Sequence, residues 1–107
     1  MRHYAPRARL VLLDMPSEGA LHEAILRYGR ADEVVGVMLP DKWDAPGARQ
    51  VFEWGPWGDG EVLARRLFAG LRALDETGVT VIICPLPEGD GVGVALRDRL
   101  KKAARKK

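Results

Sequence analysis

The segment that most constrains the fold is a short, nearly uninterrupted apolar run between two helical patterns. Residues 79–84 read VTVIIC, which predicts a strand buried on both faces of a sheet. Asp59 is suited to cap the helix before it and Gly78 to end that helix. The apolar stripe of this helix comprises Leu63, Leu67, Leu71 and Leu74. A second helix is expected after the strand. The side chains that it directs toward the core are Val92, Leu96, Leu100 and Ala103. Such helix–strand–helix alternation is typical of parallel α/β sheets.

The first half of the chain shows the same alternation. Residues 9–14 (RLVLLD) and 33–39 (EVVGVML) are apolar runs that predict two further strands, each buried on both faces. Ser17 is suited to cap the helix between them, and Gly29 is expected to end it. The buried stripe of that helix comprises Leu21, Ala24, Ile25 and Tyr28.

Residues 40–60 differ from the rest, because proline, glycine and aspartate interrupt them repeatedly. This composition predicts a loop, in which only Gln50–Trp54 favours a short strand at an edge of the sheet. Together the patterns predict an α/β fold, a small Rossmann-like three-layer domain with a mostly parallel sheet of about four strands.

Composition and charge exclude several classes of protein. With 107 residues, 47% of them hydrophobic, the chain is expected to form one domain with its own core. No apolar run approaches ~18 residues and no secretory leader is recognisable, so we expect no membrane contact. The single cysteine, Cys84, fits a reducing compartment and a cytoplasmic location.

The net charge of +2 arises from the C-terminal tail. Five of the 17 basic residues fall in residues 101–107 (KKAARKK), and the other 12 stand against 15 acidic residues, which leaves a net charge of −3 on residues 1–100. A solvated terminal tail explains this pattern better than a nucleic-acid site does.

A glycine-rich turn is a candidate phosphate or nucleotide site. Gly89, Gly91 and Gly93 lie between the last predicted strand and the last helix, where backbone N–H groups can hold a phosphate. The spacing matches neither the dinucleotide fingerprint nor a P-loop, and Asp90 would repel an anion. A tight turn that allows close helix packing explains the same glycines. Both interpretations stay open.

Three tryptophans are clustered in the interrupted segment. Trp43, Trp54 and Trp57 could form an interface with another protein, since aromatic residues are favoured at interface hot spots. They could equally hold a long loop on the sheet by burying large side chains.

No pattern in the chain indicates catalysis or metal binding. Cys84 ends a buried strand before a proline, which favours an inert core thiol. His3 and His22 have no spacing that requires them to meet it, and Ser17 lacks the Gly-x-Ser-x-Gly setting of a nucleophile. No zinc-type Cys/His cluster and no EF-hand loop is present. We therefore predict no catalytic residue and no metal site.

Residues 1–6 and 61–104 together carry a family pattern. The N-terminal residues read MRHYAP. The second half supplies Leu67-Phe68, Leu71-Arg72, Leu74-Asp75, Gly78-Val79, Gly91-Val92-Gly93, Ala95, Arg99-Leu100 and Ala103-Ala104. Both segments resemble the threonylcarbamoyl-AMP synthase family. Its C-terminal accessory domain has an LF–LR–LD helix, a GVD-I-V strand and a GLG-A-RL-AA helix, and its interdomain linker ends in Ser-Pro-Gly-Met, a few residues and His-Tyr-x-Pro.

The resemblance implies a role for the N-terminal arm. In the family the linker runs from the catalytic to the accessory domain and lies over the active-site opening. His3, Tyr4 and Pro6 match the linker motif and would face that opening. We therefore divide the chain into the end of a linker, a Rossmann-like accessory domain and a basic tail: residues 1–8, 9–104 and 105–107.

The resemblance also implies the reaction of the whole enzyme. The family makes threonylcarbamoyl-adenylate from threonine, bicarbonate and ATP, releases pyrophosphate, and so serves N6-threonylcarbamoyladenosine formation on tRNA. The lysine, arginine and serine motifs that bind its substrates belong to the catalytic domain, and nothing in this chain matches them. We expect the chain to be inactive alone, to hold no cofactor (ATP binds in the catalytic domain), and to make no direct contact with tRNA.

Its expected partner is the catalytic domain, in cis or in trans, which it would regulate through domain closure. Two alternatives belong to other classes of protein. One is an independent nucleotide- or phosphate-binding module that uses the glycine turn, and the other is a protein-interaction domain that uses the tryptophan-rich loop.

Overall fold

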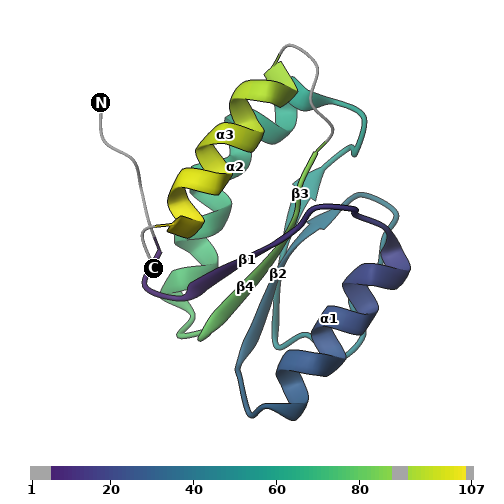
Figure 1. Cartoon of the computed structure of the whole chain (residues 1–107), viewed down its shortest axis with the longest axis vertical. Coiled ribbons are helices and arrows are strands. Elements are labelled where there is room, and N and C mark those ends of the chain that lie inside the picture. Colours follow the sequence, from purple (N-terminus) through teal and green to yellow (C-terminus); the bar gives the residue numbers. More distant parts are fainter. Residues whose placement is uncertain (1–5, 88–91, 106–107) are drawn as a thin grey trace.

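The computed structural model describes residues 6–87 and 92–105, which form a three-layer α/β domain (Figure 1). The elements in chain order are β1 (Arg9–Leu13), α1 (Glu18–Arg30), β2 (Val35–Pro40), β3 (Gln50–Gly55), α2 (Gly60–Glu76), β4 (Val81–Pro85) and α3 (Val92–Arg105). The four strands form one sheet in the order β1-β4-β2-β3, and every pair is parallel. The expected fold class is confirmed.

The sheet separates two hydrophobic cores, because successive side chains of a strand point to opposite faces. On β4, Val81 and Ile83 pack toward α1, whereas Ile82 and Cys84 pack toward α2 and α3. Figure 1 shows α1 on one side of the sheet and the α2–α3 pair on the other. At Gly70 of α2 an added Cβ would lie 2.6 Å from the Phe52 ring, so only glycine permits this approach of the helix to the sheet.

The predicted strand of residues 9–14 exists but is not buried on both faces. β1 is an edge strand, and only Leu10 of its five residues is buried. The prediction was wrong because an apolar run does not distinguish a central strand from an edge strand that a helix partly covers. The strand expected at Gln50–Trp54 does lie at an edge, the opposite one, as predicted.

The helix caps are those predicted from the sequence, with one exception. Ser17 and Asp59 cap α1 and α2 by accepting the backbone N–H groups of Ala20 and Val62, and Gly78 takes a left-handed conformation just past α2.

The exception is the end of α1, which continues past Gly29. The left-handed residue is Asp32, with φ of 64°. The N–H groups of Asp32 and Glu33 donate to the carbonyl oxygens of Gly29 and Tyr28, a Schellman ending. Aspartate tolerates this conformation better than most residues, so the turn does not need a glycine.

None of the helices in the described part of the chain is both long and apolar enough to cross a membrane.

Candidate functional site

The N-terminal arm is tied to the domain by Asp75, in the last turn of α2. Its two carboxylate oxygens accept the backbone N–H groups of Arg7 and Ala8, each at 3.0 Å. The Asp75 side chain is only 9% exposed, and Arg7 Nε lies 3.8 Å from it. A carboxylate at a helix C-terminus opposes the helix dipole, so the two N–H groups stabilise its charge there. We call this arrangement the Asp75 clamp.

The clamp fixes the backbone directly before β1. Pro6 and Ala8 are buried on either side of the exposed Arg7, and the N–H of Arg9 donates to the Thr80 carbonyl oxygen at 3.0 Å as β1 begins. Of the predicted linker residues only Pro6 is described, while His3 and Tyr4 lie outside the described residues. A role for these residues against a catalytic domain stays a prediction.

The glycine turn connects β4 to α3 at the carboxyl edge of the sheet. Gly89 and Gly91 lie outside the described residues, and Gly93 is in the first turn of α3. Arg97 Nη1 donates to the Pro87 carbonyl oxygen at 2.9 Å and so joins α3 to the end of β4. The strands β1 and β4 are neighbours, but the helices that follow them, α1 and α3, cover opposite faces of the sheet. Parallel sheets often bind ligands at the carboxyl ends of two such strands. Phosphate binding at the turn stays a prediction.

The three tryptophans form one cluster at the carboxyl ends of β2 and β3. The ring centroids of Trp43 and Trp57 are 5.3 Å apart, and those of Trp54 and Trp57 are 6.4 Å apart. Trp54 is fully buried, and its Nε1 donates to the Leu63 carbonyl oxygen at 2.9 Å. The Trp54 side chain therefore has no exposed surface that another protein could contact. Trp43 and Trp57 are half-buried against the two cores, and an interface that uses them stays a prediction.

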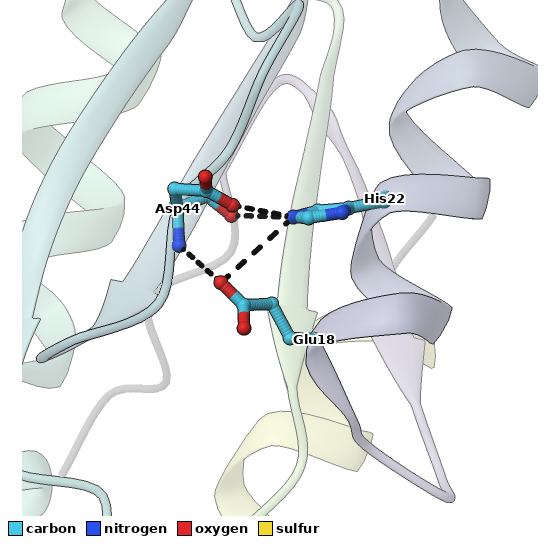
Figure 2. A group of neighbouring side chains, drawn as sticks. All are labelled: Glu18, His22 and Asp44. Atoms are coloured by element: carbon cyan, nitrogen blue, oxygen red, sulfur yellow. Dashed lines mark hydrogen bonds and ion pairs between the residues drawn. The ribbon is translucent and has the colours of Figure 1, made fainter.

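A cluster of Glu18, His22 and Asp44 links α1 to the loop between β2 and β3 (Figure 2). His22 Nε2 lies 2.6 Å from Asp44 Oδ1 and 3.0 Å from the Asp44 carbonyl oxygen. Glu18 Oε2 accepts the Asp44 backbone N–H at 2.7 Å and lies 4.0 Å from His22 Nε2.

This cluster was not predicted from the sequence. Glu18 and His22 are four residues apart and so share one helical face, which was a visible signal. Asp44 comes 22 residues after His22 in a loop without a motif, and only the fold brings it to the histidine.

The surroundings of His22 favour its protonated form. Desolvation lowers the pKa of His22, but the hydrogen bonds to the Asp44 carbonyl and carboxylate, together with the charges of Asp44 and Glu18, outweigh it. The pKa of His22 is therefore raised above its ordinary value of 6.5.

The stabilisation from His22 is expected to depend on pH. A raised pKa in the folded state means that the contribution is complete below the unfolded pKa near 6.5 and is lost as the pH rises through the folded pKa. Thermal unfolding midpoints measured across this window should fall more steeply with pH for the wild type than for His22→Gln. His3→Gln, which removes the only other histidine, is the control and should follow the wild type. Parallel profiles for the wild type and His22→Gln would contradict the expectation.

Cys84 and Ser17 have the structural roles that the sequence predicted. Cys84 is completely buried, and burial raises the pKa of its thiol, which keeps it protonated and unreactive. The Ser17 hydroxyl oxygen accepts the Ala20 backbone N–H and so caps α1.

A groove of about 450 Å³ lies between the edge strand β1 and α1. Its lining residues are Val11, Leu12, Leu13, Ala20, Glu23, Ala24, Arg27 and Tyr28. The lining combines aliphatic side chains with one acidic and one basic side chain and the Tyr28 ring, so the groove offers both polar and apolar surface.

Comparisons with known proteins agree with the fold. A family profile described as "Threonylcarbamoyl-AMP synthase, C-terminal domain" matches residues 1–105. The threonylcarbamoyl-AMP synthase of Pyrococcus abyssi is 36% identical over 106 residues, and that of Bacillus subtilis is 35% identical over 103 residues. These matches cover 96% and 95% of this chain but 30% of each relative. The chain thus spans about a third of the length of these curated relatives.

Solved structures give the same result. The crystal structure of P. abyssi Sua5 complexed with L-threonine aligns with a TM-score of 0.84 at 35% identity, over 98% of this chain and 30% of that one. A P. abyssi Sua5 variant, in which a histidine and the tyrosine directly after it are alanine, aligns with a TM-score of 0.79 at 33% identity, over 94% and 28%.

The C-terminal Sua5 domain from Pyrococcus horikoshii aligns with a TM-score of 0.74 at 29% identity. This alignment covers 91% of the present chain and 93% of the solved domain, so the two have nearly the same extent. The family match over residues 1–105 and the shared fold lead to one conclusion: the chain belongs to the family of threonylcarbamoyl-AMP synthase C-terminal domains.

Proposed function

We propose that this chain acts as the accessory domain of a threonylcarbamoyl-AMP synthase, where it holds the interdomain linker and performs no synthesis itself. The whole enzyme would convert threonine, bicarbonate and ATP into threonylcarbamoyl-AMP and pyrophosphate. The observation that carries the proposal is the family match over residues 1–105. The matched relatives are about three times as long, so most of their length lies outside the matched part.

The Asp75 clamp supports the linker role. It holds the backbone of Arg7 and Ala8, three and four residues after Tyr4 in the sequence. The P. abyssi variant replaces an adjacent histidine and tyrosine, and the only such pair in this chain is His3-Tyr4. We infer that the clamp presents this pair to the catalytic domain.

The chemistry of the described residues supports a conformational rather than a catalytic role. The Cys84 thiol is buried and protonated, and His22 pairs with Asp44 in a contact between α1 and the loop after β2. A domain of this kind would act by helping the linker to close over the active site, since closure that excludes water and completes a site can set the rate of turnover.

A reconstitution assay tests the proposal. This chain and the matching catalytic domain would be purified separately, and pyrophosphate release would be followed with threonine, bicarbonate and ATP. We expect no release from this chain alone and a changed rate when both are present. Turnover by this chain alone, or an unchanged rate both in the mixture and in the covalently joined protein, would contradict it.

The arm can be tested within the same assay. The double variant His3→Ala, Tyr4→Ala should lose the effect on the partner's rate and keep the stability of the domain. The matched control is Leu26→Ala, which shortens an exposed side chain on α1 and should act as the wild type. Equal effects of the two variants would show that the arm has no special role.

A further inference from the structure

We propose that Glu18, His22 and Asp44 form a binding site for a divalent transition-metal ion of the zinc class. The site would tie α1 to the loop between β2 and β3 (Figure 2). It is independent of the synthase reaction proposed above, because it needs neither the arm nor a catalytic domain.

The donor atoms already converge on one small volume. His22 Nε2, one Glu18 oxygen and one Asp44 oxygen all lie within 4.8 Å of one another. Tetrahedral ligands about 2.0–2.1 Å from zinc stand roughly 3.3 Å apart. His22 Nε2 lies 2.6 Å from Asp44 Oδ1 and 4.0 Å from Glu18 Oε2, on either side of that spacing. Binding an ion would lengthen the first distance and shorten the second, and both carboxylates belong to exposed or partly exposed side chains.

The chemistry of the donors selects the class of ion. An imidazole nitrogen favours zinc and its transition-metal neighbours, whereas magnesium and calcium prefer sites made wholly of oxygen. Two carboxylates with a neutral imidazole carry a charge that matches a divalent cation. On binding, the ion would take the Nε2 lone pair of His22, and any proton held there would be released to solvent.

The backbone around the site is already held in place. Glu18 and His22 sit one turn apart at the capped start of α1. The N–H of Trp43, the residue before Asp44, donates to the Pro40 carbonyl oxygen at 3.2 Å, and the Trp43 side chain packs against the core beneath α1. Asp44 is 74% exposed and His22 36%, which leaves a path for the ion and room for water as a further ligand.

Titration calorimetry with Zn²⁺ on the whole chain tests the site. We expect one ion per chain, and a loss of affinity of at least about tenfold in Glu18→Gln, in His22→Gln and in Asp44→Asn. Two controls should bind as the wild type does: His3→Gln removes the other histidine, and Glu23→Gln removes a neighbouring exposed carboxylate of α1. Circular dichroism would verify that each variant is folded.

A second readout follows the coupling of binding to stability. Zn²⁺ should raise the thermal unfolding midpoint of the wild type and leave that of His22→Gln unchanged, and Co²⁺ should give a visible absorption band that depends on the same residues. The proposal is overturned if the wild type does not bind Zn²⁺. It is also overturned if binding survives in His22→Gln or disappears in His3→Gln.

Discussion

Replacing Trp54 by alanine is expected to lower the free energy of unfolding by about 3–5 kcal/mol. The indole is fully buried and contacts the Trp57 ring, and its Nε1 donates to the Leu63 carbonyl oxygen. The substitution leaves a large cavity between β3 and α2 and removes one hydrogen-bond partner of a buried carbonyl group. We regard Trp54 as the anchor that holds α2 on the edge strand.

Urea unfolding followed by circular dichroism measures this loss without using the indole as the probe. Trp43→Ala is the matched control, because Trp43 belongs to the same cluster but is only half-buried. Its loss of stability should be clearly smaller. A loss for Trp54→Ala no larger than that for Trp43→Ala would contradict the anchoring role.

The features that sequence predicted well are those set by neighbouring residues. Ser17 and Asp59 were recognisable as caps because the hydrogen bond of an N-cap spans only three residues. The buried stripe of α2 was recognisable because its leucines recur at the helical period. These patterns, alternating with apolar strands, were sufficient to predict the α/β class.

The features that sequence did not predict depend on contacts between distant residues. The edge position of β1 follows from the order in which four strands pair, which the composition of residues 9–14 does not encode. The cluster at His22 depends on Asp44, and the clamp joins Arg7 and Ala8 to a helix 67–68 residues later. Asp75 was noted only as part of a family pattern, and its role required the fold.

The same kind of long-range contact holds the irregular segments of the domain in place. The Asp75 clamp and the His22 cluster attach irregular segments to two different helices, α2 and α1. The clamp holds the backbone of Arg7 and Ala8, whereas the cluster holds the loop that carries Trp43. A change at one site should therefore leave the other intact, since neither shares a residue with the other.

Replacing Asp75 by alanine is expected to cost about 2–3 kcal/mol of unfolding free energy, because two backbone donors lose a charged acceptor. The side chain is 9% exposed, so water replaces the lost bonds only in part. Urea unfolding measures the cost, and hydrogen exchange at the amides of Arg7 and Ala8 should become markedly faster. In the reconstitution assay this variant should lose much of the effect on the partner, because the arm no longer starts from a fixed point.

Two further variants distinguish the effect of losing the clamp from the effect of losing a negative charge on α2. Asp75→Asn keeps one acceptor oxygen and nearly the same shape, so its cost should be about half that of Asp75→Ala. Glu76→Ala removes the adjacent, exposed carboxylate and should change stability by no more than about 0.5 kcal/mol. If Glu76→Ala costs as much as Asp75→Ala, or if the two amides stay protected in Asp75→Ala, the clamp does not hold the arm. Asp75→Ala could also lose stability and amide protection but leave the effect on the partner unchanged. In that case the clamp stabilises the domain without positioning a linker.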